Sequence, residues 1–234
     1  GLDVGLLDER ADVDQPEDLI HWYTIQDRPG KSGEVKEADY AISVIIPALN
    51  EYDIIGEAIR RVKADGVEVV VADGGSTDRT AALSEEAGAQ VAGSRRGRAR
   101  QMNAGAEAAS GDILLFLHAD TALPEGFKGL IQEAVREGAA GGAFLFGTDA
   151  DTLSMAFIEN AAHFRTCRLG IVFGDQAIFA TREAFFRAGA FPEQPLMEDY
   201  ELFRRLGKVG RRTIIPRCVT TSARKWKTHG TWRI

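Results

Sequence analysis

Acidic side chains follow three apolar runs that the sequence predicts to be strands. Asn50-Glu51 follows the first run, residues 73–78 (DGGSTD) follow the second, and His118-Ala119-Asp120 follows the fourth. In an open α/β sheet, ligands bind beyond the carboxyl ends of the parallel strands, so these residues are expected to meet at one edge. A single Asp after a strand can be only a turn residue or a helix N-cap. Three such strand ends together favour a site made of carboxylates.

A carboxylate site of this kind suits a ligand whose phosphates arrive with a divalent cation. Two common phosphate-binding loops are absent from the sequence: there is no GxxxxGK followed by Ser or Thr, and no GxGxxG after the first strand. Oxygen ligands favour Mg²⁺ or Mn²⁺, and Mg²⁺ takes one or two protein carboxylates together with phosphate oxygens. Asp120 is the first candidate for the metal ligand. His118 could join it, although a strand-end His that makes only a hydrogen bond is the alternative.

The elements that must position these residues alternate along the chain from residue 40 onward. Helix N-caps are expected at Asp53 and at Ser76 or Asp78. Strands are expected at residues 42–47, 67–72, 89–92, 113–117 and 143–146, and helices at 54–64, 77–87, 99–109, 127–137, 154–168, 182–188 and 199–206. This alternation predicts an α/β fold with a mostly parallel central sheet and helices on both faces.

Charge divides the chain into two parts. Residues 1–39 hold eleven Asp and Glu against four Lys and Arg, and this segment accounts for the whole net charge of -7. We therefore expect an acidic N-terminal segment and linker over residues 1–39 and a nucleotide-binding domain over residues 40–234. Residues 202–234 hold ten Lys and Arg and no acid. That basic end could attract a diphosphate, an anionic lipid or nucleic acid, or be a solvated basic face.

The two cysteines suggest a reducing compartment, and the hydropathy of the sequence indicates no membrane-spanning segment. Cys167 and Cys218 are far apart and form no CxxC pair, so neither a zinc site nor a disulfide framework is expected. No apolar run approaches the ~18 residues of a membrane span, and no secretory leader is recognisable. We expect a cytoplasmic protein whose membrane contact, where it has one, is peripheral and at the inner face.

The order and spacing of four motifs resemble glycosyltransferase family 2, the inverting enzymes of the GT-A fold. These motifs are ISVIIPALNE at 42–51, ADGGSTD at 72–78, the apolar strand before Asp120, and MEDYEL at 197–202. The resemblance covers roughly residues 42–232. It implies a Rossmann-like sheet, a divalent cation, and a hexosyltransferase that moves a sugar from a nucleotide-diphosphate donor to an acceptor hydroxyl. The implied acceptor is unknown and could be lipid-linked, and no nucleic-acid partner is implied.

Roles at the strand ends are carried over from the resemblance residue by residue. Asn50 and Glu51 would border the nucleoside, and Asp73 would bind the base or ribose. Asp120 matches the last acid of the family's DxD element, which is the metal ligand. His118 replaces the first acid, which puts the ribose or second metal contacts in doubt.

The family resemblance also implies roles for residues at the starts of two expected helices. Arg98, Gln101 and Asn103 begin a helix and would meet the nucleotide or the diphosphate, although an ordinary basic helix start is the alternative. Asp199 occupies the family's catalytic-base position and would take the proton from the acceptor hydroxyl as it attacks the anomeric carbon. Glu198 and Asp199 could instead be first-turn acids that interact favourably with the helix dipole.

Two later segments resemble a subgroup of family 2, the radical-SAM/selenodomain-associated transferases. These segments are Gly174-Asp175-Gln176 and residues 221–226. The second matches the family's QxxRW element only in part, because no Gln lies in register. Arg224 or Trp226 would help to bind the diphosphate or the acceptor, and an exposed basic edge strand is the alternative.

The N-terminal segment carries a separate resemblance. Residues 12–19 (DVDQPEDL) are similar to the closing element of nucleotidyltransferase-like domains. An acidic arm with an N-capped helix from Pro16 is the alternative.

Two other functions compete with glycosyl transfer. A nucleotidyltransferase that makes a nucleotide-sugar shares the broad fold, but such enzymes usually carry a Gly-rich basic loop after the first strand, where this chain has residues 48–52 (ALNEY). A non-catalytic nucleotide-sugar-binding protein would use the same pocket without a role for Asp199.

Overall fold

The computed structural model describes residues 39–222 except residues 64 and 151. The expectations for the N-terminal segment, including residues 12–19, lie outside the described residues, apart from Asp39. The expectations for Arg224 and Trp226 also lie outside the described residues.

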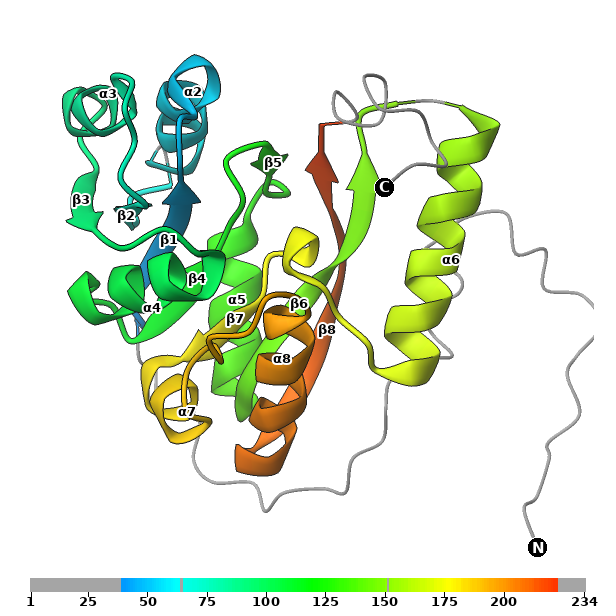
Figure 1. Cartoon of the computed structure of the whole chain (residues 1–234). Coiled ribbons are helices and arrows are strands. Elements are labelled where there is room, and N and C mark those ends of the chain that lie inside the picture. Colours follow the sequence, from blue (N-terminus) through cyan, green and yellow to red (C-terminus); the bar gives the residue numbers. More distant parts are fainter. Residues whose placement is uncertain (1–38, 64, 151, 223–234) are drawn as a thin grey trace, which may run out of the picture.

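A single eight-stranded sheet forms the centre of the molecule, with the strand order β3-β2-β1-β4-β7-β6-β8-β5 (Figure 1). The strands are β1 (Ile42–Ala48), β2 (Glu68–Asp73), β3 (Gln90–Gly93), β4 (Ile113–Phe116), β5 (Thr121–Ala122), β6 (Ala139–Thr148), β7 (Phe179–Thr181) and β8 (Arg211–Thr221). The first half is parallel, because β1 pairs with β2 and β4, and β2 pairs with β3. Beyond β4 the sheet is mixed, since β7 runs antiparallel to its neighbours while β6 and β8 are parallel.

Helices cover both faces of the sheet, which confirms the expected architecture. They are α2 (Tyr52–Lys63), α3 (Thr80–Glu86), α4 (Arg98–Ala108), α5 (Phe127–Arg136), α6 (Leu153–Leu169), α7 (Arg182–Arg187) and α8 (Glu198–Val209), with a 3-10 turn η1 (Gly174–Gln176). Apolar residues of α2, α3 and α5 pack on one face, and those of α4, α7 and α8 pack on the other. Figure 1 shows α6 at the outer edge, beside β6.

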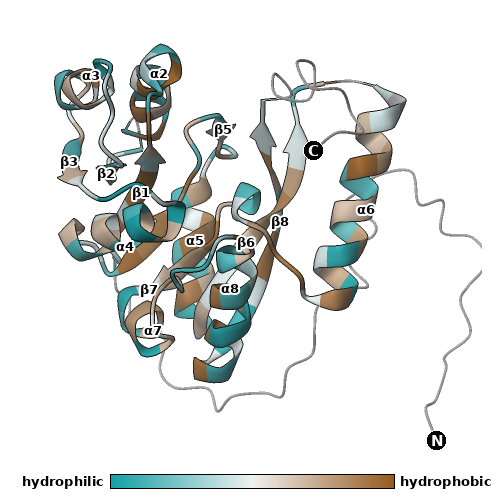
Figure 2. Ribbon diagram, in the orientation of Figure 1, coloured by the Kyte–Doolittle hydropathy of each residue, from teal (hydrophilic) through white to brown (hydrophobic). Residues whose placement is uncertain are grey.

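Two hydrophobic cores explain why the central strands read as unbroken apolar runs. Along β1, Val44 and Ile46 face one core and Ile45 faces the other, because successive side chains of a strand point to opposite faces. Leu114 and Leu115 of β4 divide in the same way. Figure 2 shows this apolar character along β1 and polar character over α8. In the described part of the chain, no helix combines the length and the hydropathy that a membrane span requires.

The strand expected at residues 143–146 is longer than the sequence indicated. β6 runs from residue 139 to 148 and includes Gly141 and Gly142, which precede the expected strand. A Cβ at Gly141 would lie 2.6 Å from the carbonyl oxygen of Phe179, and one at Gly142 would collide with the carbonyl of Thr213. The glycines therefore mark a close approach of neighbouring strands rather than a loop.

The long strand β8 was not predicted. Its register against β6 shifts between Phe144 and Leu145, whose partners are Ile215 and Cys218. Pro216 thus lies in a bulge, where a missing N–H is tolerated, and the interrupted pattern hides the strand. The two-residue β5 and three-residue β7 are too short to show a period in the sequence.

Both expected N-caps are wrong, because Asp53 lies inside α2 and the N-cap residue of α3 is Arg79. Helix α2 begins at Tyr52, so Asp53 lies inside its first turn. Asp78 does act at the start of α3, because its Oδ1 accepts the N–H of Thr80 at 2.9 Å. That helix begins at Thr80, three residues later than expected.

Candidate active site

Part of the set of residues singled out by sequence meets in a pocket of about 170 Å³ at the carboxyl ends of β1 and β4. The first residues of α4 form another side of this pocket. The pocket is lined by Pro47, Leu49, Glu51, Arg98, Gln101, His118, Ala119 and Asp120. Five of these residues were candidates from the sequence alone, and the strand-end argument correctly located the edge.

A larger hollow of about 870 Å³ lies beside α5. Its lining comes from residues 124–137 and from Arg217 of β8. None of the predicted site residues contributes to it, so the smaller pocket is the candidate active site.

The turns after β1 and β2 are joined by Asn50. This residue has a φ of 54°, a left-handed conformation that Asn tolerates better than most residues. Its N–H donates to Ser76 Oγ at 2.9 Å, and its Oδ1 accepts the N–H of Thr77 at 2.8 Å. Asn50 therefore connects two loops at the pocket edge, and its contact with a nucleoside remains a prediction.

Asp73 organises the turn that follows β2. Its Oδ2 accepts the N–H groups of Gly75 and Ser76, both at 3.0 Å, and its Oδ1 accepts the Ser76 hydroxyl. Each carboxylate oxygen can accept more than one hydrogen bond, so a ribose or base donor is compatible with this arrangement. That contact also stays a prediction.

The start of α4 supplies positive charge and N–H groups to the pocket. The first N–H groups of a helix have no intrahelical partner and, with the helix dipole, favour anions such as a diphosphate. Arg98 is the first residue of α4 and lines the pocket. It is the residue that links the pocket with the acids of α8.

The other two polar residues of α4 are committed to backbone partners. Gln101 Nε2 donates to the carbonyl oxygens of Ala48 at 2.7 Å and Ala72 at 3.1 Å, so it fixes the ends of β1 and β2. Asn103 Nδ2 donates to the Phe191 carbonyl at 2.9 Å, and its Oδ1 accepts the Phe191 N–H at 3.0 Å. Gln101 lines the pocket and Asn103 does not, so a ligand contact from Asn103 has no geometric support.

Two acids at the start of α8 lie against Arg98. Glu198 and Asp199 are 5% and 6% exposed, which is unusual for carboxylates. Arg98 Nη1 is 3.4 Å from Asp199 Oδ2, and Arg98 Nε is 3.5 Å from Glu198 Oε1. These distances are longer than those of strong charge-assisted hydrogen bonds. A better anionic partner could therefore displace the guanidinium.

Burial changes the acidity of Asp199. Burial, together with the neighbouring charges of Glu198 and Asp175, raises the pKa of Asp199 to about 6, while Arg98 and the N–H of Gly174 act in the opposite direction. The buried Oδ1 atom of Asp199 has no hydrogen-bond partner in the described residues. An unsatisfied buried polar atom costs about 1–3 kcal/mol, more when charged, and such atoms are often functional.

The turn η1 contains Asp175, an acid to which we assigned no role from the sequence. Burial raises the pKa of Asp175, which also feels the charges of Arg165, Arg98 and Asp120. Its Oδ1 is the second buried side-chain atom without a partner in the part of the chain that the structure describes. The only sequence signal was its place in the Gly174-Asp175-Gln176 motif.

Gln176 anchors that turn beneath the site. Its side chain is fully buried; Nε2 donates to the Phe144 carbonyl at 3.0 Å and to Thr166 Oγ1 at 2.9 Å. Its Oε1 accepts the N–H of Phe173 at 3.2 Å and a hydrogen bond from Arg165 Nη2 at 3.2 Å. The turn is therefore tied to both β6 and α6.

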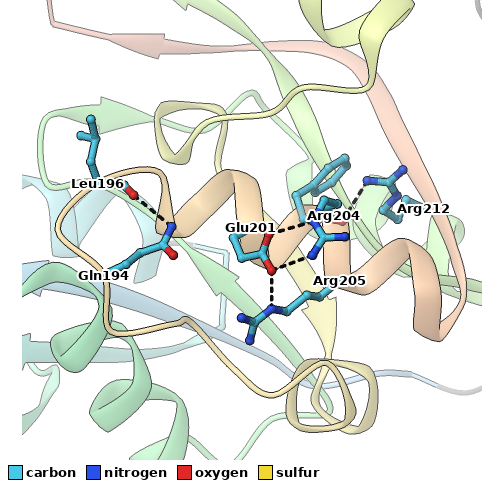
Figure 3. Close-up of polar contacts among 7 residues, drawn as sticks. Gln194, Leu196, Glu201, Arg204, Arg205 and Arg212 are labelled. Carbon is cyan, nitrogen blue, oxygen red and sulfur yellow. Dashed lines mark hydrogen bonds and ion pairs between the residues drawn. The ribbon is translucent and has the colours of Figure 1, made fainter.

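Polar contacts join residues within α8, and one hydrogen bond ties this helix to β8 (Figure 3). Glu201 accepts from Arg204 Nε and Arg205 Nε, both at 2.8 Å, and these bonds lower the pKa of Glu201 to about 2. Arg212 Nη1 of β8 donates to the Phe203 carbonyl at 2.8 Å. The acids at the start of α8 are thus presented by a fixed helix.

The donor set of the pocket fits a cation that arrives with its ligand. Among the described residues, no group of three or more His, Cys, Asp and Glu side chains could hold a metal ion. His118 and Asp120 do line one pocket, and one or two protein ligands suffice for Mg²⁺ when phosphate oxygens complete its shell. The residues therefore fit shared coordination rather than a closed protein cage.

Comparison with protein families decides the class. Residues 43–191, more than half of the chain, match the family described as glycosyl transferase family 2. The chain belongs to glycosyltransferase family 2. The match includes the acids at the strand ends and the Gly174-Asp175-Gln176 turn, and it ends before Asp199. Membership confirms the glycosyltransferase expectation made from the motifs.

Curated relatives of this family 2 chain match over part of their length. A glucosyl-3-phosphoglycerate synthase of Mycolicibacterium paratuberculosis is 35% identical over 104 residues, which cover 39% of this chain and 32% of the relative. An undecaprenyl-phosphate 4-deoxy-4-formamido-L-arabinose transferase of Pseudomonas fluorescens is 33% identical over 110 residues, which cover 41% of this chain and 32% of the relative. The matched region thus spans about a third of each relative.

Solved structures confirm the GT-A fold. A mannosyltransferase from Pyrobaculum calidifontis, in complex with GDP-Man and Mn²⁺, superposes with a TM-score of 0.65 at 21% identity, covering 92% of this chain and 66% of that one. Glucosyl-3-phosphoglycerate synthase from Mycobacterium tuberculosis, in complex with Mn²⁺, UDP-glucose and phosphoglyceric acid, gives a TM-score of 0.56 at 24% identity, with coverages of 84% and 78%. At these identities the likeness concerns the fold alone.

Proposed function

We propose that this family 2 protein transfers a sugar, with inversion, from a nucleotide-diphosphate donor to an acceptor hydroxyl, with Mg²⁺ or Mn²⁺ bound. The observation that carries the proposal is the position of Asp199, a buried carboxylate beside the pocket that contains Asp120. Arg98 contacts Asp199 and lines that pocket, so the two acids belong to one site.

The donor would occupy the pocket at the ends of β1 and β4. Asn50, Glu51 and Asp73 would contact the nucleoside, and the start of α4 with Arg98 would receive the diphosphate. Asp120, together with His118, would hold the cation, which supplies positive charge against the departing diphosphate. The fold neighbours bound to GDP-Man or UDP-glucose with Mn²⁺ support this choice of donor class and metal.

Asp199 would act as the general base. It accepts the proton of the acceptor hydroxyl while the hydroxyl oxygen attacks the anomeric carbon on the face opposite the diphosphate. With a pKa of about 6, this carboxyl is mostly ionised at neutral pH and is still basic enough to take a proton. A positioned base of this kind contributes roughly 10²- to 10⁴-fold in rate.

We also propose a lipid-linked acceptor, reached by peripheral contact with the inner face of a membrane. The relative named for undecaprenyl phosphate and the basic composition of residues 202–234 support this proposal. Each basic residue close to an anionic surface contributes about 1 kcal/mol. Liposome flotation that is independent of anionic lipid and of salt would contradict it.

Calorimetric titration of UDP and GDP, with and without Mn²⁺, tests donor binding. We expect Mn²⁺-dependent binding by the wild type and its loss in Asp120→Asn, with an unchanged unfolding midpoint. An unchanged Mn²⁺-dependent affinity in the variant would remove Asp120 from the site. Hydrolysis of the nucleotide-sugar that binds then separates an enzyme from a non-catalytic binding protein.

A further inference from the structure

The Gly174-Asp175-Gln176 turn places a second carboxylate beside Asp199, and the proposed mechanism gives it no task. We propose that Asp175 forms a sugar-binding subsite in which its Oδ1 accepts a hydrogen bond from a hydroxyl of the bound sugar. This inference rests on the proposed function and extends it to the residue that positions the sugar. Asp175 is thus a binding residue, distinct from the base.

Unsatisfied hydrogen-bond acceptors on Asp175 and Asp199 support the binding of a ligand next to these two side chains. Asp175 Oδ1 and Asp199 Oδ1 are the buried side-chain atoms that have no partner within the described residues. The two carboxylates share an electrostatic environment. The charge of Asp175 contributes to the raised pKa of Asp199, and the charge of Arg98 opposes the rise in the pKa of both acids. A polar group that donates hydrogen bonds would satisfy these oxygens. A sugar offers several hydroxyl donors in a small volume.

The turn is built to hold Asp175 in one position. Gln176 is bonded on one side to β6, through the Phe144 carbonyl, and on the other to Thr166 of α6. Gly174 lets the turn pass close to the base, since a Cβ there would lie 2.5 Å from Asp199 Oδ2. The N–H of Gly174 also donates to the Asp199 carboxylate. The spacing between the two acids is therefore fixed by the backbone.

Arg98 controls access to this subsite. Its guanidinium lines the pocket and pairs with Glu198 and Asp199 at 3.5 and 3.4 Å. A diphosphate in the pocket offers the guanidinium shorter and bidentate contacts. Movement of Arg98 toward the diphosphate would release the carboxylate of Asp199, which lies beside the η1 turn that carries Asp175.

The charges on the described elements favour a neutral sugar over an anion. Asp120, Asp175, Glu198 and Asp199 contribute four carboxylates around Arg98. An anionic group at Asp175 would be repelled, whereas hydroxyls are good donors to a carboxylate. The sugar in question is that of the donor or that of the acceptor, and two measurements separate these sources.

The first measurement compares dissociation constants for UDP and GDP with those for UDP-glucose and GDP-mannose, all with Mn²⁺. The proteins are wild type, Asp175→Asn, and the matched control Asp65→Asn at an exposed position. If Asp175 holds the donor sugar, the Asn variant binds the nucleotide-sugar about 10-fold or more weakly, the loss expected for one hydrogen bond to a charged acceptor. Binding of UDP and GDP stays unchanged, and the control behaves as wild type.

The second measurement is the partition of the donor between water and two neutral acceptors, methyl α-glucoside and methyl α-mannoside, followed by mass spectrometry. If Asp175 holds the acceptor sugar, the ratio of transfer to hydrolysis falls about 10-fold or more in Asp175→Asn while donor affinity is unchanged. Unfolding midpoints are measured in parallel. If Asp175→Asn melts at a lower temperature than wild type, the same two measurements are made on Asp175→Ser, and they decide whether Asp175 binds a sugar.

The inference is overturned if neither the affinity for the nucleotide-sugar nor the partition changes. It is also overturned if UDP or GDP and its sugar derivative lose affinity equally, because Asp175 would then act on the diphosphate. A wild-type protein that binds no nucleotide at all contradicts the proposed function itself. That failure is seen without any variant, so the two outcomes are distinguishable.

Discussion

Asp199 is held where its negative charge is disfavoured, and this position has consequences for both stability and catalysis. Burial and the nearby carboxylate of Glu198 raise the pKa of Asp199 from its ordinary value of 3.8 to about 6. Perturbed acids of this kind concentrate at functional sites. The native chain therefore binds a proton at Asp199 more tightly than the unfolded chain does.

The first prediction concerns stability. Because the folded pKa exceeds the unfolded one, the stability that protonated Asp199 provides is present below about pH 4 and is lost as the pH rises through about 6. Asp199→Asn should raise the free energy of unfolding by on the order of 1–3 kcal/mol above pH 7 and by little near pH 4. Urea denaturation of the variant and of exposed Asp65→Asn at both pH values checks this. A variant less stable than wild type at pH 8 would contradict it.

The same pKa predicts the pH dependence of the reaction. A general base works only when ionised, so kcat/KM for sugar transfer should rise about tenfold per pH unit below pH 6 and level off above it. Steady-state rates between pH 4.5 and 8 provide the measurement. A profile that is flat between pH 5 and 8 would mean that Asp199 does not titrate in the rate-determining step.

At the scale of elements, the site depends on how firmly η1 is held. Replacing Gln176 by Leu removes the donor to the Phe144 carbonyl and to the Thr166 hydroxyl, and the acceptor of the Phe173 N–H, in a buried setting. We expect a loss of about 2–4 kcal/mol in the free energy of unfolding. Gln194→Leu is the matched control, because Gln194 is only partly buried and its Nε2 donates to the Leu196 carbonyl in a solvent-exposed hydrogen bond (Figure 3). Equal urea midpoints for the two variants would show that Gln176 is no anchor.

The elements that sequence predicted best are those with the clearest periodicity. In the parallel half of the sheet, β1, β2 and β4 carry apolar runs because both faces of those strands are buried, whereas β3 is a short, partly exposed edge strand. The helices of this half were placed within a few residues. Three strands beyond β4 were missed for physical reasons: β5 and β7 are too short, and β8 is interrupted by the bulge at Pro216. Gly141 and Gly142 were left out of the expected strand at 143–146, because the strands that they pack against lie far away in sequence.

The candidate site was predictable where it follows strand ends and less so elsewhere. Glu51, Arg98 and Asp120 could be placed because parallel strands deliver their carboxyl ends to one edge. Asp175 could not, since its position depends on the buried contacts of Gln176 and on the fit of Gly174 against Asp199. Asn103 looked like a ligand contact because it begins a basic helix, but its partner Phe191 is visible only in three dimensions.

At the scale of the whole molecule, we propose that residues 1–39 are separate from the catalytic domain at 40–234. The acidic composition of that segment and the start of the family match at residue 43 support the boundary. A chain without residues 1–35 should bind UDP or GDP with Mn²⁺ as the full chain does and unfold in one cooperative step. Loss of nucleotide affinity or of cooperativity would assign the segment to the domain.

The central claim is that a family 2 site with Asp199 as its base transfers sugar from a nucleotide-sugar. Its most direct test is the rate at which UDP or GDP is released from UDP-glucose or GDP-mannose, with Mn²⁺ and a verified acceptor, by wild type and Asp199→Asn at equal donor saturation. Donor affinity should be unchanged, and turnover by the variant should fall at least ~100-fold, the lower range for loss of a general base. Near-normal turnover by Asp199→Asn would contradict the account.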